Sequence, residues 1–459
     1  MTQTGVNKMV IDNTLQLIGN TPMIKVQNID TGVCDLFLKL ECQNPGGSIK
    51  DRIAVSMIEA AEKDGKLQPG DTILEATAGN TGIGLSLVAA QKGYKMIIVL
   101  PDKMSQEKIF NLKAMGAEVV ITRSDVEKGH PEYYQEVAQK IAGETGAFYI
   151  NQFGNKANPL AHEMTTGPEI WEQLNHDVDA VVCGVGSGGT LAGLSRFFKK
   201  VSAKTEMVLA DPIGSVLVDY VNTGKFGDLG SWIVEGIGED FIPPVADFSS
   251  VKKAYSISDQ ESCETARHLL KSEGLLGGSS SGTLLAAALR YCREQNSKKR
   301  VVTFVCDTGN KYLSKVFNDY WIFEQGLSRR NPVGDLRDII SRSPEDRAVI
   351  MLGLQDTLST ALARMKMHSI SQLPVMDEET IVGIIDEMSI LNFIQSGEKG
   401  FETKVAEAMN NNFSKVHLDT EVSELTHIFK QNKIVLVYDG AKFYGLITPV
   451  DILSYLKNN

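Results

Sequence analysis

One lysine of this chain stands where a buried amine nucleophile could form. Lys50 ends a loop that contains Gly46 and Gly47, and a helical pattern follows at residues 53–63. A lysine held at the mouth of a buried site loses hydration, so its pKa falls and its amine can form a Schiff base with a carbonyl compound. A single lysine at a helix start is more commonly an exposed side chain. Its role therefore depends on residues elsewhere in the chain.

A glycine-rich loop offers a place for a phosphate group. Residues 184–190, Gly-Val-Gly-Ser-Gly-Gly-Thr, follow an apolar strand pattern and precede a helical one. Backbone N–H groups converge in such a loop, and the helix N-terminus adds partial positive charge. Gly184, Gly186 and Gly189 also satisfy the G-x-G-x-x-G pattern of a dinucleotide site, with Asp211 about twenty residues further on. An NAD-dependent dehydrogenase is therefore an alternative, as is a tight turn without a ligand.

Two further loops precede helical patterns and carry polar side chains. Residues 77–81 offer hydroxyl and amide groups from Thr77, Asn80 and Thr81 beside the unpaired N–H groups of a helix start. This combination suits a carboxylate or a phenolic oxygen, although simple N-capping is the alternative. Residues 274–283 contain three consecutive serines, 279–281. These could cap the next helix or direct one hydroxyl at a ring nitrogen.

An α/β scaffold must position these loops. Over about the first 320 residues, short β-branched runs alternate with helical patterns, which predicts a mostly parallel sheet covered by helices. The predicted strands are 36–40, 72–75, 96–100, 118–122, 180–183, 206–210 and 301–305. The predicted helices are 81–92, 105–115, 133–144, 168–174, 191–199, 259–273 and 283–295.

The C-terminal part of the chain contains an internal repeat. Residues 356–391 and 419–453 match at a spacing of about sixty, and each copy reads helix, strand, turn, strand, helix. Two such copies bury their apolar faces against each other. We therefore predict a first domain at 1–327, a linker at 328–340 and a repeat module at 341–459, with chance similarity of the two copies as the alternative.

Composition excludes several classes of protein. The 459 residues carry a net charge of −11, which disfavours a nucleic-acid partner. No apolar run approaches the roughly 20 residues of a membrane helix, and the N-terminus lacks the features of a signal peptide, so we expect a cytoplasmic protein. The six cysteines and seven histidines are dispersed without a metal-binding spacing. We therefore expect reduced thiols and no metal site.

Six motifs in order connect the chain to a known family. They resemble the fold-type II pyridoxal 5'-phosphate (PLP) enzymes in their β-replacement branch, and within it the cystathionine β-synthase family. The resemblance covers residues 10–325, and the tail resembles the paired regulatory (Bateman) module of that family. The motifs are Gly19-Asn-Thr-Pro22, Gly46-Gly-Ser-Ile-Lys50-Asp-Arg52, Ala78-Gly-Asn80-Thr-Gly-Ile-Gly84, Gly186-Ser-Gly-Gly-Thr190, Val234-Glu-Gly-Ile-Gly-Glu-Asp-Phe241 and Glu273-Gly-Leu-Leu276.

The resemblance implies a fold and a cofactor site. The expected core is tryptophan synthase β-like, with two open, mostly parallel sheets and flanking helices, followed by an α+β tandem module. Lys50 would carry the PLP as an imine. Asn80 would bond the phenolic oxygen of the ring, and Ser280 would face the pyridine nitrogen. The phosphate would be held by Gly186, Ser187, Gly188, Gly189 and Thr190.

The resemblance also implies substrate contacts and a reaction. Substrate would bind Thr77, Ala78, Gly79, Thr81 and Gln152, and the second-substrate side would be lined by Gly236, Ile237 and Gly238. The expected lyase reaction joins L-serine to L-homocysteine, giving cystathionine and water in transsulfuration and cysteine biosynthesis, with hydrogen sulfide release from cysteine as a side reaction. A neutral serine hydroxyl at the pyridine nitrogen keeps the ring a weak electron sink, which favours loss of a β-substituent over transamination.

Cysteine synthesis from O-acetylserine and sulfide is a second hypothesis within the same family. Residues 167–171 are as typical of that branch, whereas Glu235, the Glu239-Asp240 pair and the C-terminal repeat favour serine and homocysteine. Ala78 stands where the family usually has serine, so the preferred leaving group stays open. A nucleotide sensor without activity is a further alternative, against which the intact lysine argues.

The tail and the assembly also enter as expectations. The first repeat has Ser389 where the second has Asp451, so we expect any adenosyl ligand, S-adenosylmethionine or a nucleotide, to bind near Thr448 and Asp451. A purely structural role of the repeat stays equally open. The chain begins too near Gly19 for the N-terminal haem segment of vertebrate relatives, so no haem is expected. A homodimer or larger homo-oligomer is typical of the family.

Overall fold

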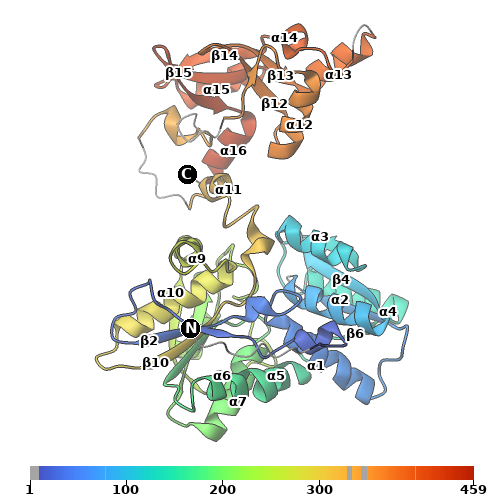
Figure 1. Ribbon diagram of the computed structural model, residues 1–459, viewed down its shortest axis with the longest axis vertical. Helices are drawn as coiled ribbons and strands as arrows, with labels where there is room; N and C mark the ends of the chain where they lie inside the picture. Colours follow the sequence, from blue (N-terminus) through green and yellow to red (C-terminus); the bar gives the residue numbers. More distant parts are fainter. Residues whose placement is uncertain (1–9, 78, 328–332, 343–348, 398–399, 459) are drawn as a thin grey trace. The chain divides into compact units, whose positions relative to one another are not determined.

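The structure is a computed structural model, and it describes residues 10–77, 79–327, 333–342, 349–397 and 400–458 (Figure 1). The chain divides into two compact units, Met1–Asn318 and Asp319–Asn459. Across the described ranges, none of the helices is both long and apolar enough to cross a membrane. The predicted domain bounds at 327 and 341 stay predictions, and residues 328–332 of the predicted linker lie outside the described residues.

The larger sheet of the first unit has six strands, and all neighbouring pairs except β1 and β2 run parallel. Its order is β1 (Met23–Lys25), β2 (Asp35–Lys39), β10 (Arg300–Phe304), β7 (Ala180–Cys183), β8 (Glu206–Pro212) and β9 (Val251–Ile257). Helices α9 (Asp259–Glu273) and α10 (Ser279–Arg293) lie on one side of this sheet, and α6 (Gly167–Gln173) and α7 (Gly189–Val201) lie on the other (Figure 1).

The smaller sheet has four parallel strands in the order β5 (Glu118–Thr122), β4 (Lys95–Pro101), β3 (Thr72–Ala76) and β6 (Phe148–Tyr149). The remaining helices of the unit are α1 (Lys50–Lys63), α2 (Asn80–Lys92), α3 (Gln106–Ala114), α4 (Tyr134–Thr145), α5 (Ala157–Ala161) and α8 (Leu217–Thr223). A π-helical turn at His162–Thr166 joins α5 to α6. The unit thus has the two open, mostly parallel sheets that the sequence predicted.

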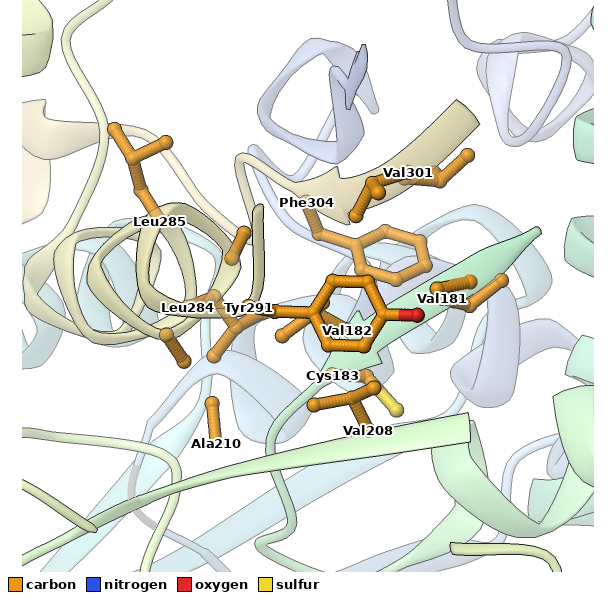
Figure 2. Packing of buried hydrophobic residues seen from close by; sticks show 14 of the residues in the cluster. Val181, Val182, Cys183, Val208, Ala210, Leu284, Leu285, Tyr291, Val301 and Phe304 are labelled. Atoms are coloured by element: carbon orange, nitrogen blue, oxygen red, sulfur yellow. The ribbon is translucent and has the colours of Figure 1, made fainter. Parts of the chain in front are cut away.

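The strands form because they are short apolar runs covered on both faces. All four residues of β7 are buried, as are four of the five in β3. Continuous apolar runs of this kind are typical of parallel sheets enclosed by helices. Figure 2 shows side chains of α10 packed against β7, β8 and β10, including Leu284, Tyr291, Val182 and Val208. This packing fixes the start of α10 relative to the ends of the neighbouring strands.

The second unit contains two similar halves. The first half has β11 (Leu352–Gly353), α12 (Leu358–His368), β12 (Gln372–Asp377), β13 (Thr380–Asp386), α13 (Glu387–Gln395) and α14 (Val405–Ala408). The second has β14 (Phe413–His417), α15 (Val422–Phe429), β15 (Ile434–Asp439), β16 (Lys442–Ile447) and α16 (Pro449–Asn458). Helix α11 (Asp319–Glu324) opens the unit. Each half forms one three-stranded sheet.

The internal repeat is visible in the details of these halves. The β12–β13 hairpin shifts register at Val375/Met376, and the β15–β16 hairpin shifts at the corresponding Val437/Tyr438. Ile381 and Ile384 of one sheet share a buried cluster with Ile434 and Leu436 of the other. The prediction that the two copies bury their apolar faces against each other is therefore confirmed. The elements missed from the sequence are strands β1, β6, β9, β11 and β14 and helices α5, α8, α11 and α14.

Candidate active site

One pocket of the first unit collects most of the side chains that the sequence singled out. Of the predicted residues, those lining it are Lys50, Thr77, Asn80, Thr81, Gln152, Gly186, Ser187, Thr190, Gly236, Ile237, Gly238 and Ser280. Gly79, Gly188 and Gly189 lie behind this lining, in the loops that carry it. Ala78 lies outside the described residues, so its predicted substrate contact has no structural description.

Four helices begin at the wall of this pocket. Lys50 is the first residue of α1, Asn80 the first of α2, Thr190 the second of α7 and Ser280 the second of α10, and all four side chains line the pocket. The N-terminus of a helix presents unpaired N–H groups and partial positive charge. Four such ends around one cavity favour a ligand that carries negative charge on more than one group.

The amine of Lys50 occupies a protein-enclosed position in the pocket. Its backbone N–H donates to the Oγ of Ser48 at 3.2 Å, and the neighbouring Ile49 N–H donates to the carbonyl of Cys306 at 2.9 Å, so the loop is tied to the chain that follows β10. Burial lowers the pKa of Lys50, against the opposing charges of Cys306, Asp307 and Glu239. A lowered pKa favours the neutral amine that nucleophilic attack on a carbonyl needs.

The glycine-rich loop is tightly packed, which explains its composition. A Cβ on Gly186 would lie 2.5 Å from the carbonyl oxygen of Gly236, and one on Gly189 would overlap the Asn158 amide. Gly188 has a φ of +87°, a conformation that costs little only for glycine. The Nδ2 of Asn158 donates to the Oγ of Ser187 at 2.9 Å, which orients that hydroxyl. The loop therefore brings backbone N–H groups and two hydroxyls to the start of α7.

Asp211 does not behave as the acidic residue of a dinucleotide site. It is fully buried beneath the end of β8, outside the pocket lining, and burial raises its pKa to about 7. A ribose-binding carboxylate has to be accessible and charged at the ligand. The glycine spacing that suggested a dehydrogenase is therefore explained by close packing of the loop.

The loop after β3 holds its polar groups in defined orientations. The hydroxyl of Thr81 donates to Oε1 of Gln152 at 2.7 Å, and the Nε2 of Gln152 donates to the carbonyl of Ala76 at 3.3 Å. The hydroxyl oxygen of Thr77 accepts from the N–H of Gly79 at 3.1 Å, which directs its own proton elsewhere. Asn80 donates from Nδ2 to Asp307 at 2.7 Å. These side chains form one polar wall of the pocket.

The three consecutive serines have different surroundings. The Oγ of Ser279 accepts from the backbone N–H of Glu235 at 3.2 Å, and the Oγ of Ser281 accepts from the N–H of Cys306 at 3.0 Å. Only the middle serine of the three, Ser280, lines the pocket. The sequence offered three candidates, and the structure places one hydroxyl at the ligand side.

The acidic residues after β8 divide into two kinds. The carboxylate of Glu235 is paired with the amines of Lys108 and Lys315, each at 2.7 Å, and these charges lower its pKa although burial alone would raise it. Glu235 also lines the pocket, so its carboxylate is held in place by the two lysines at the pocket wall. Glu239 and Asp240 line the pocket, and burial followed by repulsion from Asp240 raises the pKa of Glu239 well above its usual value.

Several pocket residues were not predicted from the sequence. Cys183, Phe304 and Cys306 line it from the ends of β7 and β10, and burial raises the pKa of both thiols. Lys103, Arg123, Tyr133 and Tyr134 line it from the smaller sheet and its connections. The first group could have been predicted, because these residues end predicted strands and ligands bind at the carboxyl ends of parallel strands. The second lies in connections without a recognisable motif.

In the second unit, Thr448 and Asp451 contact each other. The Oδ2 of Asp451 accepts from the backbone N–H and the hydroxyl of Thr448 at 2.8 and 2.6 Å, and its Oδ1 accepts from Ser341 at 2.7 Å. In the first repeat the two residue types change places: Asp386 corresponds to Thr448, and Ser389 corresponds to Asp451. The hydroxyl of Ser389 donates to Asp386 at 2.8 Å. In both repeats, an aspartate and a hydroxyl residue are therefore hydrogen-bonded to each other at the start of a helix.

Comparison with known proteins places this arrangement in a family. A family model described as pyridoxal-phosphate dependent enzyme matches residues 14–307, and one described as CBS domain matches residues 336–396 and 405–458. The cystathionine β-synthase of Apis mellifera is 35% identical, over 100% of this chain and 93% of that protein. The cysteine synthase of Staphylococcus aureus strain Mu50 is 42% identical, over 66% of this chain and 96% of that protein.

A solved structure agrees with the first unit. The hydrogen sulfide-producing enzyme of Fusobacterium nucleatum aligns with a TM-score of 0.62 and 37% identity, over 66% of this chain and 100% of that one. Sequence similarity, fold and pocket residues thus indicate the same enzyme family. The chain belongs to the PLP-dependent enzymes of fold type II, within the cystathionine β-synthase family, and carries two CBS domains.

Proposed function

We propose that the chain condenses L-serine with L-homocysteine to give cystathionine and water. The observation that carries this choice is the extent of similarity. Cystathionine β-synthases match the pocket unit and the repeat unit together, over 100% of this chain, whereas the cysteine synthase match covers 66%. The reaction class, β-replacement on a PLP-bound amino acid, is common to both families.

The pocket residues fit PLP. The cofactor has an aldehyde, a phenolic oxygen, a ring nitrogen and a phosphate, and the pocket offers an amine at Lys50, an amide at Asn80 and a hydroxyl at Ser280. The loop at residues 186–190 would take the phosphate, because a side chain on Gly186 would collide with the carbonyl of Gly236 and the start of α7 attracts anions. The neutral hydroxyl of Ser280 lines the pocket and would face an uncharged ring nitrogen.

Lys50 is the group that moves protons. When bound, PLP withdraws electrons from the α-carbon of an attached amino acid and so makes its α-proton acidic. The amine of Lys50, once displaced from the cofactor by the substrate amine, would accept the α-proton of serine. It would later return a proton to the α-carbon of the product. The lowered pKa of Lys50 favours the neutral form of this amine.

The polar wall after β3 would hold the substrate carboxylate. Thr77 and Thr81 supply hydroxyls, and the hydrogen bond from Thr81 to Gln152 fixes the amide beside them. The serine β-hydroxyl would leave as water with the proton that Lys50 had accepted. The homocysteine thiol would pass its own proton to Lys50 as its sulfur bonds to the β-carbon. Gly236, Ile237 and Gly238 line the side from which that thiol would approach.

A cysteine synthase that uses O-acetylserine and sulfide is the second candidate. The higher identity to the Staphylococcus aureus enzyme, 42%, favours it within the pocket unit. Both candidates require Lys50 and PLP, so they differ only in the leaving group and the thiol.

One experiment separates the two candidates. The purified protein is assayed with serine plus homocysteine and with O-acetylserine plus sulfide, and kcat/KM is compared for each pair. We expect cystathionine formation to be preferred. A preference for O-acetylserine and sulfide by orders of magnitude would establish the second candidate instead. As a control, Lys50→Ala should abolish turnover in both assays, and borohydride should fix the cofactor to Lys50 in the parent protein.

The remaining roles are proposals of the same kind. The paired CBS domains would bind an adenosyl ligand near Thr448 and Asp451, S-adenosylmethionine or a nucleotide, and transmit its presence to the enzyme unit. A cytoplasmic location and assembly into a homodimer or larger homo-oligomer are the further expectations that the family supports.

A further inference from the structure

The segment that follows β10 connects the three loops around the cofactor pocket. Cys306 accepts from the N–H of Ile49, beside Lys50, at 2.9 Å, and its own N–H donates to Ser281 at 3.0 Å. The N–H of Thr308 donates to the carbonyl of Gly47 at 3.0 Å. The side chain of Asp307 reaches Asn80 at 2.7 Å. This segment ends in a short 3₁₀ turn, Gly309–Tyr312, that carries a buried lysine.

Lys311 joins the Lys50 loop to Asn80. Its side chain is buried, and its Nζ donates to the carbonyl oxygens of Gly46 at 2.8 Å and Gly47 at 3.3 Å and to the Oδ1 of Asn80 at 3.0 Å. An ammonium group has three N–H donors and no acceptor, so these three acceptors use all of them. The ammonium is therefore a cross-link between two loops that lie about thirty residues apart in the sequence.

The contacts of Asn80 define the orientation of its amide. Its oxygen faces the ammonium of Lys311, which can only donate, and its nitrogen faces the carboxylate of Asp307, which accepts. Turning the amide over would place two donors together and two acceptors together. Asp307 is held in turn by the hydroxyl of Tyr312 at 2.6 Å. Asn80 lines the pocket, and its amide nitrogen, which also interacts with the Tyr312 hydroxyl, is the donor that it presents to a ligand there.

We propose that Lys311 is a positioning residue for the cofactor: it orients the Asn80 amide as a hydrogen-bond donor to the phenolic oxygen of PLP and holds the Lys50 loop at the distance that this contact needs. The proposal rests on the proposed contact of Asn80 with the cofactor. Burial, against the charges of Asp307 and Asp51, lowers the pKa of Lys311 to about 8, so the cross-link is complete only below that pH. Lys108 and Cys42 are the other titratable groups acting on it.

The test measures the affinity of the apoprotein for PLP by titration of the visible absorbance of the bound cofactor. Lys311→Met removes the three donors, and Lys311→Gln keeps an amide donor without the charge. We expect each variant to raise the Kd for PLP at least about tenfold, because hydrogen bonds from charged groups are the strong ones. In an Asn80→Ala background, the further loss caused by Lys311→Met should shrink to about threefold or less, since residues in one network are not additive.

A second buried lysine provides a matched control. Lys39 also has three acceptors, the carbonyl of Thr21 and the side chains of Glu169 and Gln173, but it does not line the pocket. Lys39→Met should lower the Tm and leave the Kd for PLP unchanged. A purely structural Lys311 would show the same pattern, and that result would overturn the proposal, as would an equal loss of affinity with and without Asn80. An unchanged Kd in Asn80→Ala alone would show that Asn80 does not contact the cofactor, and that part of the proposed function would be wrong.

Discussion

Single buried side chains in this protein respond to pH because they have few partners. Glu75 in β3 is fully buried, its Oε2 accepts from the N–H of Gln152 at 3.2 Å, and its Oε1 has no hydrogen-bond partner in the described structure. Burial raises the pKa of Glu75 to about 8, against the hydrogen bonds from Gln152 and Asn151. The residue therefore supports the loop that carries Gln152 mainly in its neutral form.

This predicts a pH-dependent stability. Between the ordinary pKa of about 4.5 and the folded value of about 8, the folded chain keeps a proton that the unfolded chain has lost, so stability falls as pH rises through that window. Glu75→Gln removes the titration. The free energy of unfolding of the variant minus that of the parent protein should be larger at pH 8 than at pH 5, by on the order of 1–4 kcal/mol. Urea unfolding at both pH values measures it, with the exposed Glu118→Gln as control; an equal difference at the two pH values would contradict the assignment.

At the scale of elements, an ion network with little exposure to solvent joins three elements of the first unit. Arg52 donates from Nε and Nη2 to the two oxygens of Glu41 at 2.8 Å and from Nη1 and Nη2 to Glu169 at 2.7 Å. Lys39 bonds the same Glu169 at 2.7 Å. Burial would raise the pKa of Glu169, but Arg52 and Lys39 together lower it to about 2. The network joins β2, α1 and α6, so it stabilises the packing of these elements.

Breaking this network should be costly. Arg52→Met leaves two buried carboxylates without their main partner, and the free energy of unfolding should fall by roughly 3–5 kcal/mol at pH 7. Lys66→Met, which breaks an exposed pair with Asp64, should cost less than about 1 kcal/mol. Denaturant unfolding of both variants provides the comparison. Similar small losses for the two would show that the buried network does not stabilise the unit.

At the scale of the whole molecule, the cofactor pocket and the proposed adenosyl-ligand site belong to different units. The residues that line the cofactor pocket all belong to the unit Met1–Asn318, and Thr448 and Asp451 belong to the unit Asp319–Asn459. The two repeats differ at this helix start, which has Asp386 and Ser389 in the first repeat and Thr448 and Asp451 in the second. One repeat therefore presents an aspartate where the other presents a serine, and ligand binding is expected to be unequal as well.

This inequality can be measured by calorimetry with S-adenosylmethionine, AMP and ATP on the full chain. We expect Asp451→Ala to weaken binding of the preferred ligand at least about tenfold. Asp386→Ala removes an equivalent helix-start contact in the first repeat and should leave that affinity within about twofold. Turnover without ligand should stay unchanged in both variants. Equal losses from the two substitutions would contradict a site in the second repeat.

Much of the fold was predictable because its signals are local. The apolar runs of β3, β7 and β10 and the glycine, threonine and serine loops that follow strands can be recognised within about ten residues. The repeat was visible because its two copies preserve the same hairpin and helix start. Strand β9 was missed because its residues alternate in exposure and include two lysines, Lys252 and Lys253, so it lacks an apolar run.

The sequence by itself determined which loops lie at strand ends, that a helix follows the loop ending at Lys50 and that the tail is a duplicated unit, because these features depend on neighbouring residues. Only the tertiary structure decided that Ser280 faces the pocket while its neighbours bond the backbone, and that Lys311 spans from Gly46 to Asn80. Glu235 is paired with Lys108 and Lys315, which lie 127 and 80 residues away from it in the sequence. Contacts of that range arise from packing of sheets and helices, and no local pattern encodes them.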